Sequence, residues 1–555
     1  MNYSNIPLAQ QIVQLCEKKG VKHVVISPGS RNAPLTISFS SHPNINTYSV
    51  VDERCAAFFA LGMAQQLQQP IAVVCTSGSA MLNYHPAVAE AFYSQIPLVV
   101  ISADRPQHLI GIGDGQTIYQ ENIFGKHVLY SANLSEHSKQ NQIDINTAIN
   151  TAKGHNGPVH INVPFAEPLY ETQPEMTEAI TVIPEEVSDY SIDESAYADF
   201  TQQWNTSHKR MVLIGVNTPN NIEQDVLEYL ANDKATIVLT ESTSNVHHEN
   251  FCSSIDKYIA PLDSEDFQKL RPETLVTIGG LVVSKKVKKF LRTYQPEAHF
   301  HVGTCKALDT YFCLQHHFKL NETHFFKRLM ADALPVNSSY QTQWLSIKTH
   351  RAIQHDAYLK TIPFSDFKAF ESILKAIPEH SVLHLSNSST IRYVQLFNQN
   401  PSVIQYCNRG TSGIDGSTST AIGHAAVSAQ QNILITGDLS FFYDSNALWN
   451  NYMPKSFRII VINNSGGGIF RILPGQKNTE NFETYFETTH NLTAEYLCQM
   501  YGMSYKAVSN AADLQSELSC FFLDDEKPAL LEIFTPRTTN DDVLLQYFEF
   551  MRNNA

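Results

Sequence analysis

Short runs of aliphatic and β-branched residues alternate with helical patterns along the whole of this 555-residue chain. Unbroken apolar runs of this length, separated by helices, are typical of parallel strands that are buried on both faces. We therefore predict an α/β protein built from doubly wound parallel sheets. In the first third of the chain, strands are expected at 23–27, 71–76 and 98–102, and helices at about 33–39, 53–67 and 86–93.

The same alternation recurs twice more along the chain. Further strands are predicted at 211–215, 236–239, 274–279 and 298–302, followed by a helix-rich stretch at 325–358, and then at 381–385, 433–436, 458–462 and 529–533. An acidic, proline-containing stretch without periodicity, 172–194, is predicted to be a linker. Because domains commonly hold roughly 150 residues, we predict three of them, at 1–180, 195–345 and 360–555.

Two segments of the chain share one order of elements. IAVVCTSGSAMLNYHP, which begins at Ile71, and NILITGDLSFFYDS, which begins at Asn432, each run from a strand through a polar loop into a helix. A second strand follows in both cases. The first and third domains are therefore predicted to be related sheets. Each sheet would carry its ligand-binding loops at the carboxyl ends of the strands, where open α/β sheets bind ligands.

Charge and cysteine content restrict the class of protein. The formal net charge of −15 excludes an extended basic surface for nucleic acid or anionic membranes. The most apolar stretches, such as 96–103 and 459–462, are far shorter than the roughly 18 residues of a membrane span. The nine cysteines form no C-x-x-C pair, and the N-terminus lacks the pattern of a signal peptide. We expect dispersed reduced thiols and a cytoplasmic protein.

The clearest chemical motif occupies the ends of two consecutive strands in the third domain. Gly437-Asp438-Leu439-Ser440 follows one strand, and Asn464 stands 26 residues after Asp438, at the start of NSGGG. This places carboxylate, carboxamide and carbonyl oxygens at one edge of the sheet, and Mg²⁺ prefers such ligands. The nearby glycines would let the backbone approach a diphosphate, to which Ser440 could donate. Either half alone is better explained as an ordinary turn, whereas the pair at this spacing favours a site.

This pattern resembles the metal–diphosphate motif of the thiamine-diphosphate enzymes, although Leu439 stands where that family usually has glycine. The resemblance implies pyrimidine-binding, central and diphosphate-binding α/β domains, thiamine diphosphate, and Mg²⁺ or Mn²⁺ as cofactors. The metal ligands implied are Asp438, the side chain of Asn464 and the carbonyl of Gly466, with Gly437, Leu439 and Ser440 beside the cofactor.

The same resemblance implies a glutamate that contacts N1′ of the cofactor's aminopyrimidine and activates it. Glu53, in SVVDERCAAFF, follows a strand and opens a helix, as this role requires. On spacing alone, Glu53 is better explained as a first-turn acid that the helix dipole favours, with Asp52 as the cap. The presence of the diphosphate motif reverses that preference.

Five motifs narrow the resemblance further. ISPGSRNAPL, TSGSAMLNYHPAVAEA, SADRP, CNRGTSGIDGSTSTAIG and NNSGGGIF occur in this order. Together they resemble the family of 2-succinyl-5-enolpyruvyl-6-hydroxy-3-cyclohexene-1-carboxylate synthases of menaquinone biosynthesis. The resemblance covers both outer domains and is weak in the central one, apart from GGLVVSKKVKKFL. It implies decarboxylation of 2-oxoglutarate and addition of the resulting four-carbon carbanion to isochorismate.

Both of these substrates are dianions, and arginine can bind a carboxylate through two parallel hydrogen bonds. The resemblance assigns substrate binding to Ser30, Arg31, Arg105, Lys285, Ser388, Arg392 and Arg409. Each arginine would stand in a loop beside a strand end, although any one of them alone could be a surface charge. Lys286 and Lys288 compete with Lys285 in the alignment.

Apolar positions complete the implied site. Ile414 would support the thiazolium ring of the cofactor. Ile469, Phe470 and Leu473 would line the pocket around the bound cofactor and substrate. Gln116 would form a hydrogen bond within the site. Ordinary core packing is the alternative for the aliphatic residues. The sequence departs from the family pattern at two positions, with Gly468 in place of glutamine and Arg471 in place of serine. The resemblance therefore does not assign the groups that contact the second substrate at the edge of the site.

The resemblance also implies at least a homodimer, either dimer or tetramer. The cofactor would lie between the first domain of one subunit and the third domain of another. Two alternatives stay open. One is a different thiamine-diphosphate decarboxylase or an acetohydroxyacid-synthase-like carboligase, which would have little use for several arginines. The other is a non-catalytic α/β binding module, against which Glu53, Asp438 and Asn464 argue.

Overall fold

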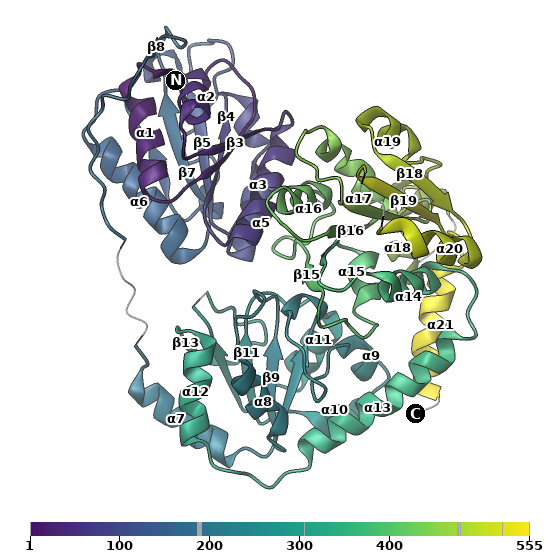
Figure 1. Cartoon of the computed structure of the whole chain (residues 1–555). Coiled ribbons are helices and arrows are strands. Elements are labelled where there is room, and N and C mark those ends of the chain that lie inside the picture. The colour runs from purple at the N-terminus through teal and green to yellow at the C-terminus, as the bar shows by residue number, and fades with distance from the viewer. Residues whose placement is uncertain are drawn as a thin grey trace.

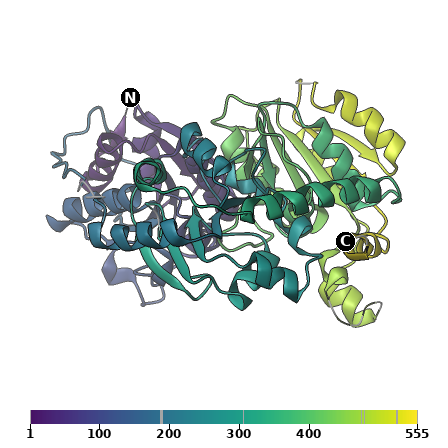
Figure 2. The same ribbon diagram turned by 90° about the horizontal axis from the view of Figure 1, so that it is seen from below.

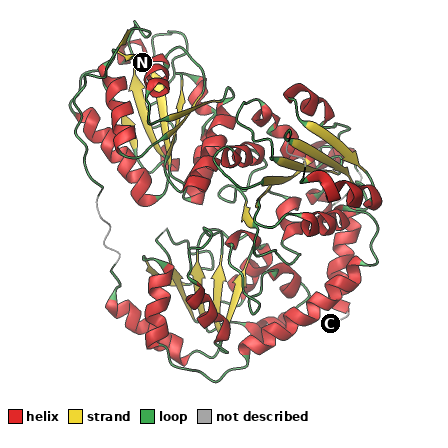
Figure 3. Cartoon of the chain, in the orientation of Figure 1, coloured by secondary structure: helices red, strands yellow, loops and turns green. Residues whose placement is uncertain are grey.

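Three parallel sheets, each covered by helices on both faces, make up the chain (Figures 1 and 3). The structure is a computed structural model that describes residues 2–185, 191–304, 306–473, 475, 477, 479–523 and 526–553. The predicted α/β class with doubly wound parallel sheets is confirmed. A short antiparallel pair, β1 (Tyr3–Ser4) with β8 (Thr172–Gln173), takes up the start of the predicted linker. Residues 186–190 of that linker lie outside the described residues.

The first domain has a six-stranded sheet in the order β3-β2-β4-β5-β7-β6. Its central strands are continuous apolar runs because helices cover both of their faces. The strands are β2 (His23–Ile26), β3 (Asn46–Ser49), β4 (Ile71–Cys75), β5 (Leu98–Asp104), β6 (Ser131–Asn133) and β7 (Val159–Pro164). The main helices are α1 (Pro7–Lys18), α2 (Ala33–Ser41), α3 (Glu53–Leu67), α5 (His85–Ser94) and α6 (Gln140–His155).

The third domain repeats this topology strand for strand, in the order β15-β14-β16-β17-β19-β18. The predicted relationship between the two outer sheets is thereby confirmed at the level of topology. The strands are β14 (Val382–Leu385), β15 (Ile404–Tyr406), β16 (Asn432–Gly437), β17 (Arg458–Asn463), β18 (Ser504–Val508) and β19 (Ala529–Phe534). The helices include α14 (Asp366–Ala376), α15 (Ser389–Val394), α16 (Ser417–Ala425), α17 (Asp438–Tyr443), α18 (Ile469–Ile472), α19 (Glu495–Tyr501), α20 (Ala511–Phe521) and α21 (Asn540–Asn553).

The central domain has a five-stranded sheet in the order β10-β9-β11-β12-β13. Its strands are β9 (Arg210–Ile214), β10 (Thr236–Thr240), β11 (Thr274–Ile278), β12 (Ala298–Val302) and β13 (Leu314–Phe318). Its helices include α7 (Glu194–Thr206), α8 (Gln224–Asn232), α9 (Ile255–Ile259), α10 (Ser264–Leu270), α11 (Lys285–Thr293) and α12 (Glu322–Asp332). The long helix α13 (Tyr340–Leu359) continues past residue 345 and packs on α21, where Tyr358 donates to the carbonyl of Val543.

The two outer domains share one apolar core through α3 and α16, and they lie side by side in both views (Figures 1 and 2). Gly62 on α3 and Gly423 on α16 make this approach possible. A Cβ atom on Gly62 would lie 2.0 Å from the carbonyl oxygen of Thr420, and one on Gly423 would lie 2.0 Å from that of Phe59. Only glycine lets the two helix backbones meet so closely.

Two sequence-level expectations concern the chain as a whole. Within the described residues, no helix combines the length and the hydropathy that crossing a bilayer requires. The eight cysteines that the structure describes are all free, and six of them are buried. The expected pattern of dispersed thiols therefore holds for these eight.

Candidate active site

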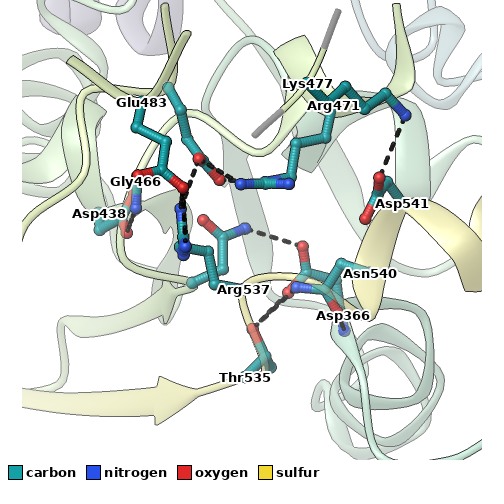
Figure 4. A network of polar contacts seen from close by, with 12 residues as sticks. Asp366, Asp438, Gly466, Arg471, Lys477, Glu483, Thr535, Arg537, Asn540 and Asp541 are labelled. Carbon is teal, nitrogen blue, oxygen red and sulfur yellow. Dashed lines mark hydrogen bonds and ion pairs between the residues drawn. The ribbon is translucent and has the colours of Figure 1, made fainter. Parts of the chain in front are cut away.

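Asp438 and Asn464 lie at the carboxyl ends of the neighbouring parallel strands β16 and β17. Both side chains are buried. The Asp438 carboxylate accepts hydrogen bonds from the backbone amides of Leu439, at 2.7 Å, and Gly466, at 3.0 Å. Figure 4 shows Asp438 and Gly466 together at this sheet edge. The three predicted metal ligands are thus brought into one place by the fold.

The side-chain amide of Asn464 has a fixed orientation. Its Nδ2 donates to Oδ2 of Asp366 at 2.9 Å, whereas its Oδ1 is buried without a hydrogen-bond partner among the described residues. A buried oxygen without a partner is unfavourable by about 1–3 kcal/mol, so the geometry favours a ligand there. An oxygen donor next to a carboxylate fits a hard divalent cation.

Asp366 is held in turn by residues beyond β19 (Figure 4). Thr535 donates to its Oδ1 at 2.6 Å, and the backbone amide of Asp366 donates to Oδ1 of Asn540 at 2.8 Å. Burial raises the pKa of Asp366 to about 6. Sequence analysis missed this residue because it stands 98 positions before Asn464, at the start of α14.

The glycine run after Asn464 packs against another part of the same chain. Gly466 has a φ of +150°, and a Cβ atom on it would lie 2.7 Å from the carbonyl oxygen of Glu487. Gly467 donates its amide to that same oxygen. The Glu487 carboxylate is buried and pairs with Arg471 and, at 2.7 Å, with Arg537. Arg471, which departs from the family pattern, therefore completes a buried ion network behind the loop (Figure 4).

The predicted cofactor-facing groups of the third domain fall into two kinds. Ser440 donates its hydroxyl hydrogen to the carbonyl of Ile414 at 2.6 Å, so in this structure it supports the predicted pedestal instead of pointing a hydrogen toward a diphosphate. Ile414, Phe470 and Leu473 are 37–49% exposed. Ordinary core packing is therefore wrong as an explanation for the aliphatic Ile414 and Leu473, and all three side chains are open to a ligand or a partner.

Glu53 opens α3 as predicted, with Asp52 as the N-cap that accepts from the amide of Cys55 at 3.2 Å. Burial, followed by the neighbouring charge of Asp52, raises the pKa of Glu53. Its flanking residues contact the third domain, where Asn446 donates to Asp52 at 2.8 Å. Within the described residues, no hydrogen bond links the Glu53 carboxylate itself to that domain.

Apart from Lys285, the predicted substrate-binding residues form two groups that lie in different domains. The first group, in the first domain, contains Ser30, Arg31, Arg105 and Gln116. Arg31 is buried, donates to the carbonyl of Phe165 at 2.8 Å and pairs with Glu167 at 3.1 Å. Burial and the nearby positive charge of Arg105 lower the pKa of Arg31. Arg105 donates to the carbonyl of Gly115, which directly precedes the exposed Gln116.

The second group, in the third domain, contains Ser388, Arg392 and Arg409. Arg409 donates to Oδ1 of Asn387 at 2.5 Å, and burial together with the charge of Arg409 lowers the pKa of Arg392. The Nε atoms of both arginines are buried without hydrogen-bond partners in the described chain. One expectation is wrong: Arg392 lies within helix α15 and not in a loop. Ser388, which precedes α15, has a φ of +71°, a strained conformation of the kind found at functional sites.

Lys285 stands at the first position of α11 and is exposed, with no hydrogen bond or ion pair to the described residues. Its competitors are engaged elsewhere. Lys286 lies over the ring of Phe548 at 4.5 Å, and Lys288 donates to the carbonyl of Val282 at 2.7 Å. Of the three lysines, Lys285 is therefore the best placed to bind an anionic ligand.

A cavity of about 340 Å³ lies where the three domains meet. Among the predicted site residues, Arg409 alone lines it. Apart from Arg409, the predicted site residues therefore lie outside this cavity.

Comparison with known proteins agrees with this arrangement. The family model described as "Thiamine pyrophosphate enzyme, N-terminal TPP binding domain" matches residues 6–143. The model of the corresponding C-terminal TPP binding domain matches residues 387–533. A 2-succinyl-5-enolpyruvyl-6-hydroxy-3-cyclohexene-1-carboxylate synthase of Flavobacterium psychrophilum is 54% identical over 99% of this chain and 100% of its own length. Proteins of the same name from Christiangramia forsetii and Phocaeicola vulgatus are 52% and 38% identical, over at least 99% of each chain.

Proposed function

Because the chain belongs to the 2-succinyl-5-enolpyruvyl-6-hydroxy-3-cyclohexene-1-carboxylate synthase family of thiamine pyrophosphate enzymes, we propose that it decarboxylates 2-oxoglutarate and joins the four-carbon product to isochorismate. The chain is a thiamine-diphosphate-dependent transferase. The observation that carries the proposal is the buried cluster of Asp438, Asn464 and Gly466, in which the Asn464 Oδ1 lacks a partner.

In this proposal Asp438, Asn464 and the carbonyl of Gly466 hold Mg²⁺ or Mn²⁺, to which the cofactor's diphosphate binds. Gly437 and Leu439 would line the diphosphate site, and Ser440, which donates to the carbonyl of Ile414, would hold that residue against the cofactor. When bound, thiamine diphosphate supplies the electron sink that lets a 2-oxo acid lose carbon dioxide.

Glu53 is proposed to share a proton with the ring nitrogen N1′ of the cofactor. Glu53 stands at the first turn of α3, and burial raises the pKa of its carboxyl group, which favours a proton-sharing role. The half-buried Ile469 and the exposed Phe470 and Leu473 are proposed to exclude water from the reacting carbon.

The two cation groups are proposed to bind the carboxylates of the two substrates. Arg392 and Arg409 each keep an Nε without a partner, and Lys285 is exposed and unpaired among the described residues. Arg31 and Arg105 add positive charge from the first domain. An acetohydroxyacid-synthase-like enzyme acting on pyruvate would not need so many cations.

We also propose a homodimer or a larger homo-oligomer, because the resemblance to the thiamine-diphosphate enzymes implies a cofactor held between the first domain of one subunit and the third domain of another. Ser30, Arg31, Arg105, Gln116 and Glu53 lie in the first domain, whereas the metal cluster and the second arginine group lie in the third. A partner subunit that supplies its first domain would complete the site. We also propose the domain limits 1–180, 195–345 and 360–555, and a cytoplasmic location, which the free thiols support.

Incubation of the protein with thiamine diphosphate, Mg²⁺, 2-oxoglutarate and isochorismate tests the reaction. We expect loss of isochorismate and a product of the mass of the adduct. Decarboxylation of 2-oxoglutarate that leaves isochorismate untouched would instead favour a simple decarboxylase.

Subunit mixing tests the shared site. Glu53→Gln and Asp438→Ala variants should each be inactive. After dissociation and reassociation in equal amounts, random pairing should restore about a quarter of wild-type activity in a dimer, because half of the dimers then hold one complete site. No recovery in demonstrated mixed oligomers would place both residues in one chain's site.

A further inference from the structure

Glu90 links the first domain to a loop of the third domain. It lies on α5 and is 1% exposed. Its carboxylate accepts from the backbone amides of Gly410 and Thr411, both at 2.7 Å, and from the Thr411 hydroxyl at 2.8 Å. Ser94 donates the fourth hydrogen bond, at 2.7 Å. A buried carboxylate with four donors is well satisfied, and three of its donors belong to the other domain.

The loop that Glu90 holds connects β15 to α16 and carries two proposed site residues, Arg409 and Ile414. Its other anchors come from the third domain. Asn387 donates to the carbonyls of Asn408 at 2.7 Å and Gly413 at 2.8 Å, and Ser440 donates to that of Ile414. None of these bonds fixes the backbone amides at 410 and 411, which point to Glu90.

The close fit at Gly410 shows how tightly this anchor is built. A Cβ atom on Gly410 would lie 2.6 Å from the carbonyl oxygen of Glu90 and 3.0 Å from its Cδ. Only glycine allows the loop backbone to reach the carboxylate from this side. Arg409 is the residue immediately before this contact, so any shift of the loop moves the base of its side chain.

We propose that Glu90 is a positioning residue for substrate binding, which sets the place of Arg409 by clamping the loop from the first domain of the same chain. This inference rests on the proposed function of Arg409 as a carboxylate-binding group. It assigns a role in the reaction to a buried acid that touches neither the metal cluster nor the proposed substrates. It also makes the docking of the first domain on the third a condition for a correctly placed arginine.

The test compares Glu90→Gln with Ser94→Ala. The glutamine keeps the volume but presents an N–H₂ group to backbone donors. Ser94→Ala removes one donor from the same carboxylate and leaves its three hydrogen bonds from the loop in place. In Glu90→Gln, hydrogen exchange of the Gly410 and Thr411 amides should become about tenfold faster or more, because their hydrogen bonds weaken. In Ser94→Ala it should stay at the wild-type rate, and α16 should stay protected in both variants.

Steady-state kinetics distinguish a positioning role of Glu90 from a purely structural one. Arg409→Lys identifies the substrate whose KM depends on Arg409. Glu90→Gln should raise the KM of that same substrate about tenfold and change the other KM by less than about threefold, as expected for loss of a charge-assisted hydrogen bond. A fall in kcat with both KM values unchanged, or exchange and KM values like those of the wild type, would overturn the proposal.

Two further measurements cover the cases in which Glu90→Gln does not fold or the proposed function fails. If Glu90→Gln does not fold, Thr411→Val removes only the hydroxyl donor and should raise the same KM about threefold, again with the other KM unchanged. If the wild-type protein leaves isochorismate untouched, the proposed function fails on that result alone. Hydrogen exchange at Gly410 and Thr411 still decides whether Glu90 anchors the loop.

Discussion

Asp366 accepts a 2.9 Å hydrogen bond from Nδ2 of Asn464, and this single contact decides which end of the Asn464 amide faces the proposed metal. With its N–H₂ group bound to a carboxylate, the amide leaves its buried oxygen without a partner among the described residues. A negative partner behind an amide ligand also makes its oxygen a stronger donor.

Replacing Asp366 with asparagine should weaken the binding of Mg²⁺ about 10- to 100-fold, because groups behind metal ligands have effects of that size. The measurement is the thermal shift of the protein at fixed thiamine diphosphate during a Mg²⁺ titration. Glu371→Gln is the matched control, since Glu371 lies on the same helix and, among the described residues, forms its ion pairs with Lys368 and Lys375. Equal Mg²⁺ affinities for the two variants would contradict the expectation.

Glu53→Gln should bind thiamine diphosphate and Mg²⁺ with near wild-type affinity but lose at least about 100-fold in kcat. Glutamine keeps the shape of the side chain and cannot exchange the proton, and general acid–base groups contribute on that scale. Thermal shift reports binding, and consumption of 2-oxoglutarate reports turnover. Retention of more than a tenth of the activity would remove Glu53 from its proposed role.

Lys285→Gln should raise the KM of one substrate, whereas Lys286→Gln should leave both KM values unchanged. The two lysines are neighbours on α11, but Lys286 is engaged with the ring of Phe548. Loss of a charge-assisted contact at Lys285 predicts a rise of about tenfold. Steady-state kinetics of the two purified variants would check this, and the reverse pattern would assign the contact to Lys286.

Gly62→Ala should destabilise the protein, because the new methyl group would meet the backbone of α16 and neither helix can move without separating the domains. Overpacking of this kind raises the free energy of the folded state by about 3 kcal/mol. Gly154→Ala is the matched control: Gly154 lies in helix α6, with no atom within 4 Å of the added Cβ. There, alanine should stabilise by up to about 1 kcal/mol. The two melting temperatures should therefore move in opposite directions, and equal shifts would refute the close-packing account.

Acid should destabilise the fold through His160, whose pKa burial lowers from 6.5 to about 3. Between these values the unfolded chain binds a proton that the folded chain does not, so stability falls as the pH falls. The loss is about 1.4 kcal/mol per pH unit, or about 2 kcal/mol between pH 6.5 and 5.

His160→Gln removes this pH-dependent contribution to the free energy of unfolding. His160 shares hydrogen bonds with Ser102 at 2.8 Å, so the variant should be less stable than the wild type near pH 8. Its deficit should shrink by about 2 kcal/mol by pH 5. Denaturant titrations at the two pH values check this, and a constant deficit would show that His160 does not titrate as described.

The sequence by itself determined the layout of this protein. Unbroken apolar runs such as 71–75 predicted strands covered on both faces, and the shared pattern after Ile71 and Asn432 predicted two related sheets. Asp438 and Asn464 could be placed together because they end consecutive strands, and parallel strands end at the same edge. Each of these inferences depends on spacing along the chain, which a single sequence displays directly.

Tertiary structure alone decided which distant groups meet. Asp366 behind Asn464, Glu487 between Arg471 and Arg537, and Glu90 beneath the Arg409 loop come from separate elements. Local patterns do not mark such contacts, because a buried charge is stable only where the packed fold brings its partners to it. The fold also divided the predicted cations among the three domains. The sequence therefore supplied the candidate residues of the proposed site, and packing determined how they are held.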